Sequence, residues 1–244
     1  MVLKPDVEND ISYGEEIITV DVVKGTEFVI IHAIEGDFTN IESFTVKQGG
    51  TVFNKKREFY HNDEAKQQYY VVELEEPLGV DEAELHITWK GALVGTLVGI
   101  NKVTYQDDGM EKYIIATKFE PTYAREAFPC FDEPAMKANY SLVMYHEESH
   151  EGLWNMPVVS RECGCDDCDA KMCKTTFMTS PKMGTYQPTF IVHNMTHIEG
   201  VILKYFNTRM SLELVEHIDT QCSGVSSEHP LSICSNCHSS EDTQ

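Results

Sequence analysis

The sequence predicts an all-β protein, built as a sandwich or a pair of packed, mostly antiparallel sheets. Three observations lead to this fold class. Many short segments alternate between apolar and polar residues, turn signals separate them, and no long helical pattern is present. The chain has 244 residues, of which 41% are hydrophobic and 10% are aromatic. That length and composition suit a globular protein with a buried core.

The clearest strand is AELHITWK at residues 83–90. Leu85, Ile87 and Trp89 fall on one face of an extended chain and the polar residues fall on the other, as in a half-buried strand. The same two-residue period, or an enrichment in β-branched residues, predicts eight further strands. In chain order these are EEIITVDVV (15–23), TEFVIIHAI (26–34), IESFTVK (41–47), YYVVELEE (69–76), KYIIATK (112–118), NYSLVMY (139–145), KTTFMT (174–179) and GVILKYF (200–206).

Turn signals separate these strands, and the strand pattern ends near residue 206. The signals are Lys24-Gly25, Gly49-Gly50, Asp108-Gly109 and Pro181. Beyond residue 206, SLELVEHID has the pattern of a short helix, and the last residues are rich in Ser, Cys and acidic side chains. We therefore expect one β domain over residues 1–206 and a short helix with a mobile tail over residues 207–244.

The formal net charge is −21, from 40 acidic and 19 basic residues. Such a charge repels a phosphate backbone and an anionic membrane, so we expect neither nucleic-acid nor lipid binding. No apolar run reaches the roughly 20 residues of a membrane-spanning helix, and the first residues lack the regions of a signal peptide. The chain as written is therefore expected in the cytoplasm. Its two glycosylation sequons, Asn139-Tyr-Ser141 and Asn194-Met-Thr196, would matter only in an exported protein.

Residues 146–150 spell HEESH, which matches the H-E-x-x-H motif of zinc hydrolases. On a helix this spacing places His146 and His150 one turn apart as zinc ligands, with Glu147 as the general base. Asp169 follows about where one family of such enzymes has its third ligand. The motif raises the question of a zinc site in this chain.

The residues around HEESH favour a strand instead of a helix. Residues 140–145 alternate as a strand, and Gly152 and Pro157 would break a helix soon after the motif. We therefore interpret HEESH as a chance match at a solvent-facing strand end or turn, and we expect no metal there.

Four of the eight cysteines lie within eleven residues, at Cys163, Cys165, Cys168 and Cys173. Such a loop could wrap one zinc ion, although the spacing is tighter than in ordinary structural zinc sites. Two disulfides in an exported protein would explain the cluster as well, and so would unliganded thiols. The sequence leaves these three interpretations open.

Residues 118–134, KFEPTYAREAFPCFDEP, form the most informative stretch. Two prolines bracket an aromatic pair, and Arg125 stands close enough in sequence to pair with Asp132 or Glu133. Taken by itself, this pattern predicts a rigid loop that is held by a charge pair.

The longer stretch KFEPTYAREAFPCFDEPAMKANYSL resembles the N-terminal domain of the zinc aminopeptidases of the aminopeptidase N and puromycin-sensitive aminopeptidase family. Two residues depart from the pattern, because the family commonly carries an aspartate at Tyr123 and an arginine or lysine at Glu126. Other segments resemble successive parts of the same domain, from about residue 3 to about residue 206. They are LKPDVEND, GEEIITVDV, LHITWKGALVGTLVGINKVTY, WNMPVVS and TTFMTSPKMGTYQPTFIV.

The resemblance implies a saddle-like β domain that lends one side of the peptide pocket to a separate catalytic zinc domain. Glu120 matches the family residue that binds the free α-amino group of a peptide substrate, and Lys118 matches a nearby lining position. The family's zinc ligands lie in the next domain, so we expect neither a catalytic residue nor a cofactor in this chain. Alone, it is expected to lack aminopeptidase activity.

A second hypothesis is a stand-alone binding or decoy module for peptides or proteins. Such a module would use the face that the catalytic domain covers in the family, and an exposed apolar patch at residues 128–134 would favour it. The family includes cytosolic enzymes and membrane-anchored ectoenzymes, so a truncated start would leave the second location open.

Overall fold

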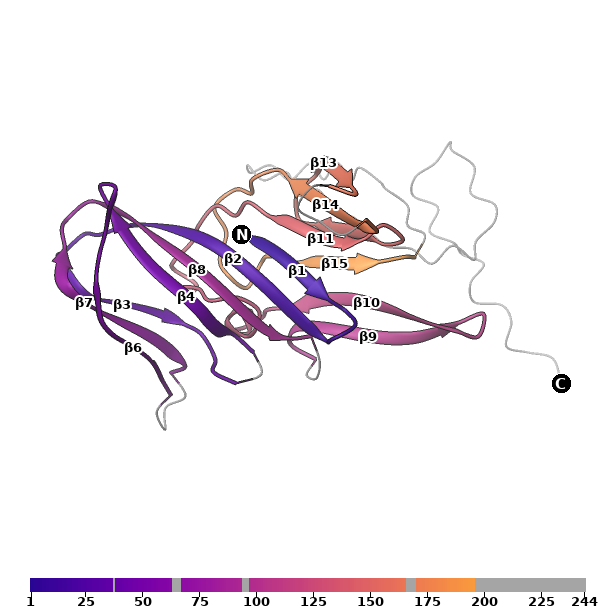
Figure 1. The fold of residues 1–244 in the computed structure, drawn as a ribbon, viewed down its shortest axis with the longest axis horizontal. Coiled ribbons are helices and arrows are strands. Elements are labelled where there is room, and N and C mark those ends of the chain that lie inside the picture. The colour runs from indigo at the N-terminus through magenta and orange to yellow at the C-terminus, as the bar shows by residue number, and fades with distance from the viewer. Residues whose placement is uncertain (37, 63–66, 94–96, 166–169, 196–244) are drawn as a thin grey trace, which may run out of the picture. The chain divides into compact units, whose positions relative to one another are not determined.

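The computed structural model describes residues 1–36, 38–62, 67–93, 97–165 and 170–195. Within these ranges the chain forms strands and one turn of 3-10 helix (Figure 1), which confirms the predicted all-β class. The elements are β1 (Val2–Asp6), β2 (Ile11–Asp21), β3 (Thr26–His32), β4 (Asn40–Gln48), β5 (Thr51–Val52), β6 (Lys55–His61), β7 (Tyr69–Leu78), β8 (Glu82–Ala92), β9 (Gly99–Asp107), β10 (Met110–Lys118), η1 (Ala124–Glu126), β11 (Val143–Glu147), β12 (Glu151–Trp154), β13 (Val158–Cys163), β14 (Met172–Phe177) and β15 (Phe190–His193).

The strands form one large sheet and two small ones. The large sheet has the order β13-β14-β11-β1-β2-β8-β4-β5. A four-stranded sheet has the order β12-β15-β10-β9, and a three-stranded sheet has the order β3-β7-β6. Among the described strands, the pairing is antiparallel except between β1 and β11, where Val2 lies opposite Val143 in a parallel pair. The prediction of mostly antiparallel sheets is therefore confirmed.

Strand β8 lies between β2 and β4 in the large sheet, and its burial pattern follows the alternation of its sequence. Leu85, Ile87 and Trp89 are all buried, as the two-residue period requires. The Trp89 ring lies against Gly14 of β2, where an added Cβ would come within 2.1 Å of it. The Trp89 indole nitrogen donates a hydrogen bond to the Ala127 carbonyl at 3.0 Å. Strand β8 thus contacts the loop that follows β10 through Trp89.

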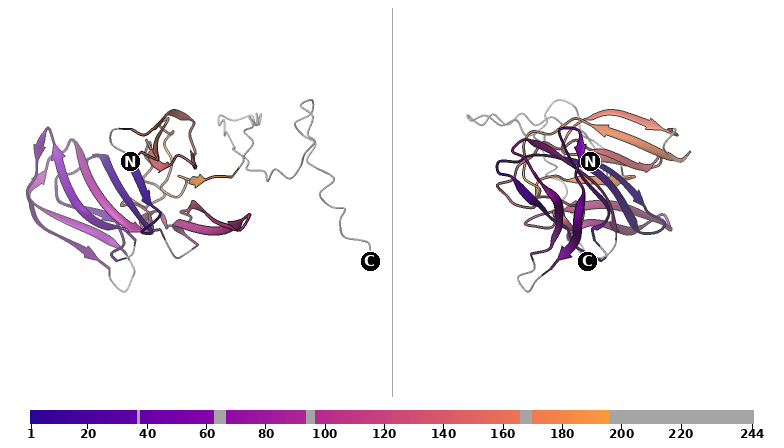
Figure 2. Two further views of the ribbon diagram at one scale, coloured as in Figure 1. Left: turned by 45° about the vertical axis from the view of Figure 1, so that its right-hand side comes forward. Right: turned by 60° about the vertical axis from the view of Figure 1, so that its left-hand side comes forward.

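The two small sheets pack against different parts of the large sheet. Phe44 of β4 stacks on Tyr70 of β7, with 5.7 Å between ring centroids, so the three-stranded sheet covers the β4 side. Trp154 of β12 meets Phe177 of β14 edge to face at 5.9 Å, so the four-stranded sheet covers the β14 side. Figure 2 shows this arrangement from two further directions. Residues 119–134 contact both small sheets, because Phe119 packs on Phe190 of β15 and Cys130 hydrogen-bonds to His32 of β3.

Several strands and boundaries differ from the predicted ones. Strand β6 was not predicted, because nearly all of its residues are exposed and its sequence KKREFYH has no apolar period. It forms at the edge of the three-stranded sheet, where Lys56 and Arg57 both pair with the buried Glu73 of β7. The predicted strand at residues 139–145 begins at Val143, because the preceding residues bond instead to Ser180.

Contacts between residues divide the chain into a compact unit, Met1–Asn194, and the remainder, Met195–Gln244. The predicted domain boundary at residue 206, the strand at 200–206, the short helix and the tail lie outside the described residues. No helix in the described part of the chain has the length and apolar character needed to cross a membrane.

Strand β2 carries a buried acid among the apolar residues of the core. Glu16 is 7% exposed, and its Oε1 has no hydrogen-bond partner. Burial raises the pKa of Glu16 to about 8, partly offset by the Met1 amino group. The folded state therefore holds this proton more tightly than the unfolded state does.

We predict that this acid makes stability fall as pH rises. Because the folded pKa lies above the unfolded one, the contribution is fully present below about pH 4.5 and is lost on the way to about pH 8. Chemical unfolding should show a loss of up to about 1.4 kcal/mol per pH unit in this window. Glu16→Gln should remove that loss, and Glu15→Gln, at the exposed neighbouring residue, should keep it. An unchanged pH profile in Glu16→Gln would contradict the prediction.

Candidate functional site

A buried ion pair holds the loop at residues 119–134. Arg125 Nε donates to Asp132 Oδ2 at 2.9 Å, and the two side chains are 9% and 1% exposed. Arg125 Nη2 also donates to the Asp132 carbonyl at 3.3 Å, and Thr185 Oγ1 donates to Asp132 Oδ1 at 2.6 Å. These hydrogen bonds compensate the desolvated charges and fix the loop. The predicted charge pair is confirmed, with Asp132 as the partner.

Neighbouring segments bind the same ion pair. The Asp132 amide donates to His32 Nδ1 at 3.1 Å, and His32 exchanges two backbone hydrogen bonds with Cys130. Burial and the Arg125 guanidinium lower the pKa of His32, so its neutral ring accepts that amide proton. Thr39 Oγ1 donates to the Arg125 carbonyl at 3.0 Å. The loop is thereby joined to the end of β3 and to the turn before β4.

The candidate substrate-binding residues lie at the start of this loop. Lys118 is the last residue of β10 and lies opposite Gly99. Phe119 is 2% exposed and packs edge to face on Phe128, with 5.6 Å between ring centroids. Glu120 follows and is exposed, as is Lys118. The structure anchors the backbone at Phe119 and leaves the next carboxylate on the surface.

The segment proposed as an apolar patch for a decoy module is not one. Phe128 and Cys130 are buried, and Phe131 is half-buried. Within residues 128–134, Glu133 and Pro134 are the exposed positions. The observation that would favour a stand-alone binding module is therefore missing from this segment.

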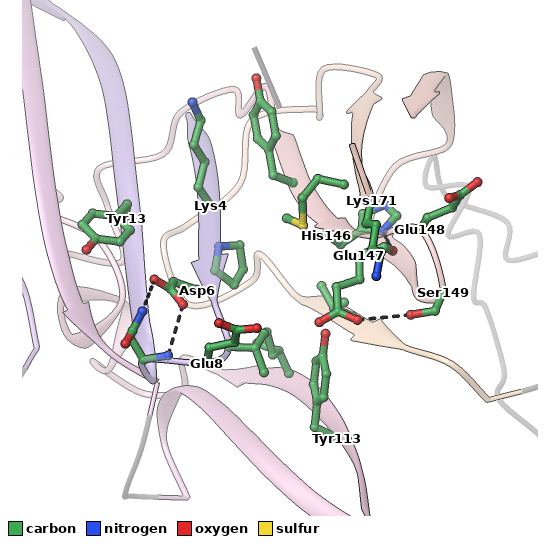
Figure 3. A pocket seen from close by; sticks show the side chains of 17 residues that line it. Lys4, Asp6, Glu8, Tyr13, Tyr113, His146, Glu147, Glu148, Ser149 and Lys171 are labelled. Atoms are coloured by element: carbon green, nitrogen blue, oxygen red, sulfur yellow. Dashed lines mark hydrogen bonds between the residues drawn. The ribbon is translucent and has the colours of Figure 1, made fainter. Parts of the chain in front are cut away.

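A separate open cavity of about 1320 Å³ lies between the large sheet and the four-stranded sheet. Figure 3 shows Lys4, Asp6 and Tyr13 on one side of it and Tyr113 and Glu147 on the other. Lys118 and Glu120 do not line it. The lining residues are Lys4, Pro5, Asp6, Val7, Glu8, Asn9, Tyr13, Tyr113, Ile115, Tyr145, His146, Glu147, Glu148, Ser149, Lys171, Met172 and Val192.

Three of the charged side chains in this cavity contact neighbours from the same chain. The Lys4 ammonium lies 4.5 Å from the centroid of the Tyr145 ring, a cation–π contact. Both oxygens of Asp6 accept hydrogen bonds from Asn9, and these bonds lower the pKa of Asp6. Ser149 donates to Glu147 at 3.2 Å. The cavity is thus a polar, aromatic-lined gap, and each of these contacts lies within one sheet or one turn.

The HEESH motif connects β11 of the large sheet to β12 of the four-stranded sheet. His146 and Glu147 end β11, and His150 directly precedes β12. The prediction of a strand end and turn is confirmed. The prediction that this segment faces solvent is wrong for both imidazoles, which are buried. His146 is 3% exposed and His150 is 6% exposed. His146 falls on the inward side of β11, against Gly152 of β12.

Both ring nitrogens of His146 are occupied. Its Nδ1 lies 2.9 Å from the Glu147 carbonyl, and its Nε2 lies 2.8 Å from Thr175 Oγ1. Since a carbonyl only accepts, Nδ1 carries the proton and Nε2 accepts the threonine hydroxyl. Burial lowers the pKa of His146, in agreement with this neutral form.

Ser149, His150 and Glu147 lie close together, yet they are not arranged as a catalytic triad. Ser149 Oγ is 2.9 Å from His150 Nδ1, and Glu147 Oε2 is 3.7 Å from the same nitrogen. A triad needs the acid at the opposite ring nitrogen, where it orients the base. His150 Nε2 is instead buried without a partner, and the ring stacks on Tyr113 at 4.2 Å. The three residues close a turn.

The residues of HEESH do not fit a zinc ion. Zinc requires two imidazole nitrogens with free lone pairs that converge on one point. His146 has none to offer, and the remaining nitrogen of His150 is buried. Across the described ranges, no group of three or more His, Cys, Asp or Glu could hold a metal ion. Asp169 lies outside those ranges.

The cysteine cluster forms at least one disulfide. Cys163 of β13 lies opposite Cys173 of β14 in the antiparallel register, and the two are joined. These two sulfur atoms are therefore not available as thiolate ligands. Cys165 follows two residues after Cys163, and Cys168 lies outside the described residues. Of the three interpretations left open by the sequence, the structure selects a disulfide for this pair.

The strands define an all-β domain of one large sheet and two small ones. The family model described as the peptidase M1 N-terminal domain matches residues 1–187. The chain therefore belongs to the M1 family of zinc metallopeptidases, as its N-terminal domain. The resemblance found in the sequence is confirmed.

Among individual proteins, the chain is similar to glutamyl aminopeptidases. That of Rattus norvegicus is 37% identical over 197 residues, which are 79% of this chain and 20% of the relative. That of Homo sapiens is 35% identical over 203 residues, 82% of this chain and 20% of the relative. Aminopeptidase Q of Homo sapiens is 38% identical over 133 residues, 54% of this chain and 13% of the relative. The chain thus spans about a fifth of the length of these glutamyl aminopeptidases.

Apart from His146 and Glu147 of HEESH, sequence reasoning missed the residues that line the cavity. Tyr145 comes from β11 of the large sheet, and Tyr113 comes from β10 of the four-stranded sheet. Strand alternation places each of these side chains on a face but does not show which strands become neighbours. The parallel pairing of β1 with β11, which brings Lys4 to Tyr145, has no local signal.

We predict that breaking the buried ion pair destabilises the domain strongly. Asp132→Ala leaves the Arg125 guanidinium buried and unpaired, so the free energy of unfolding should fall by about 3–5 kcal/mol in urea titrations. Glu42→Ala is the matched control, because Glu42 and Lys90 form an ion pair whose side chains are 44% and 47% exposed. Its loss should cost about 0–1 kcal/mol. Equal losses in the two variants would contradict the argument.

We also predict that a tryptic digest without reductant links residues 162–171 to residues 172–174. Trypsin cleaves after Arg161, Lys171 and Lys174, so the Cys163–Cys173 disulfide should hold the two peptides together until reduction. Mass spectrometry of protein prepared without reductant measures this directly. Cys163→Ser should separate the peptides, whereas Cys165→Ser should leave them joined. A free 172–174 peptide in the unreduced wild-type digest would show that the bond is absent.

Proposed function

We propose that this chain acts as the N-terminal domain of an aminopeptidase and helps to bind the free α-amino group of a peptide through Glu120. The observation that carries the proposal is the position of this carboxylate. It is exposed, and it directly follows a buried phenylalanine in a loop that a buried ion pair holds. Membership of the M1 family supports it, because the relatives that the chain matches are named aminopeptidases.

The physical basis is a charge-assisted hydrogen bond. A carboxylate accepts from the ammonium of a peptide N-terminus, and such bonds are shorter and stronger than neutral ones. The held loop lowers the cost of ordering the acceptor when the peptide arrives. Lys118 carries the same sign of charge as the ammonium, so we assign it to the lining of the site and not to binding the amino group.

The chain alone is proposed to be inactive. Water activation by zinc requires a metal with an open coordination position, and the donors of HEESH in this chain are engaged elsewhere. The rest of a longer protein would supply the hydrolytic residues. The proposed contribution of this chain is to position the substrate's N-terminus.

A chimera tests the assignment of Glu120. Residues 1–194 replace the matching segment of a glutamyl aminopeptidase, and hydrolysis of an aminoacyl reporter is followed. Glu120→Ala should raise KM and lower kcat/KM about 10- to 100-fold, because this is the loss of binding expected when one hydrogen bond to a charged group is removed. Glu111→Ala, at an exposed acid of β10, should leave both KM and kcat/KM unchanged.

Two outcomes would contradict the proposal. If Glu120→Ala behaves like Glu111→Ala in the chimera, Glu120 does not bind the amino group. If the isolated chain with added zinc releases amino acids and loses that activity in Glu120→Ala, the chain is active alone.

A further inference from the structure

The sequon Asn139-Tyr140-Ser141 lies on the surface of the domain. Residues 133–139 are all exposed, and Ser141 is exposed as well. Tyr140 is half-buried and packs against the core. In an extended segment successive side chains point to opposite sides. Asn139 and Ser141 therefore share the solvent side, with Tyr140 as the anchor between them.

The Asn139 carboxamide can take a glycan without losing its contact. Its Nδ2 donates to the Ser180 carbonyl at 2.7 Å. An amide nitrogen carries two protons, and attachment of a sugar replaces one of them. The second remains for Ser180. The Tyr140 amide also donates to Ser180 Oγ at 2.9 Å, which holds the segment independently of Asn139.

The other sequon, Asn194-Met195-Thr196, is placed differently. Asn194 is half-buried, and its Oδ1 accepts a hydrogen bond from the Tyr105 hydroxyl at 2.8 Å. Thr196 lies outside the described residues. The geometry thus distinguishes the two asparagines and selects Asn139.

The disulfide supplies an independent argument about compartment. Structural disulfides such as Cys163–Cys173 form and persist in oxidising compartments, including the lumen of the secretory pathway. That lumen is also where Asn-x-Ser/Thr sequons are glycosylated. The disulfide therefore argues against the cytoplasmic location expected from the chain as written. It favours the compartment in which sequons are glycosylated.

We propose that Asn139 is an N-glycosylation site of this domain. A lipid-linked oligosaccharide diphosphate is the donor. The bond from Asn139 Nδ2 to C1 of the first sugar forms as the bond from C1 to the diphosphate oxygen breaks. The diphosphate leaves with the bonding electron pair, and the amide nitrogen gives up one proton to a base of the transferase. The glycan then covers the face around residues 133–139.

The test directs the chain into the lumen of eukaryotic cells with an added, cleavable signal peptide. Treatment of the recovered protein with a peptide N-glycosidase should increase its gel mobility by one glycan and convert Asn139 to aspartate in peptide mass spectra. Asn139→Gln and Ser141→Ala should both abolish the shift. Ser141→Thr, which restores a hydroxyl, and Asn194→Gln should keep it.

Either of two results would overturn the proposal. One is a wild-type protein that leaves the lumen with its disulfide formed but shows no shift. The other is a full shift that persists in Asn139→Gln. Ser141→Ala leaves the Asn139–Ser180 contact intact, so a loss of glycan in that variant is not explained by misfolding at Asn139.

Discussion

The buried pair of Arg125 and Asp132 is the interaction on which the arrangement of this domain depends. Its partners come from distant parts of the chain: His32 from β3, Thr39 from the turn before β4, and Thr185 from the segment before β15. Burying two charges is costly unless every group is paired, and here the carboxylate and the guanidinium both have several partners. The pair therefore holds together segments of the three sheets and fixes the loop that carries Glu120.

Much of the fold could be predicted from local sequence. Strands β4 and β8 bury alternate side chains, and β7 begins with a run of apolar residues. Both patterns can be recognised within a few consecutive residues of the sequence. Strand β6 could not be found in this way, because it is a charged edge strand whose stability comes from its neighbour β7. The start of β11 was placed too early for a related reason, since Asn139 and Tyr140 bond to Ser180 and not to the ladder.

The candidate sites could also be predicted only where neighbouring residues determine them, and not where residues far apart in the sequence do. The Arg125 pair was predictable from sequence spacing, but only burial shows that Asp132 and not Glu133 is the partner. Glu120 was found through family resemblance and would not stand out otherwise, because it is one of many exposed acids. In HEESH, a strand and a turn direct the two imidazoles into different contacts, His146 with Thr175 and His150 with Tyr113. Strand register, not cysteine spacing, determines that Cys163 meets Cys173.

The parallel pairing of β1 with β11 has a consequence for how the protein is made. Strand β1 is synthesised well before β11, one of its two neighbours in the large sheet, which starts at Val143. Until that residue has been synthesised, β1 exposes an unpaired edge, and the large sheet can contain only β1, β2, β8, β4 and β5. The domain therefore completes its largest sheet only after most of its own residues have been synthesised, through contacts of high sequence separation that form slowly. An incomplete chain that ends before β11 would present this open edge to other chains and to chaperones.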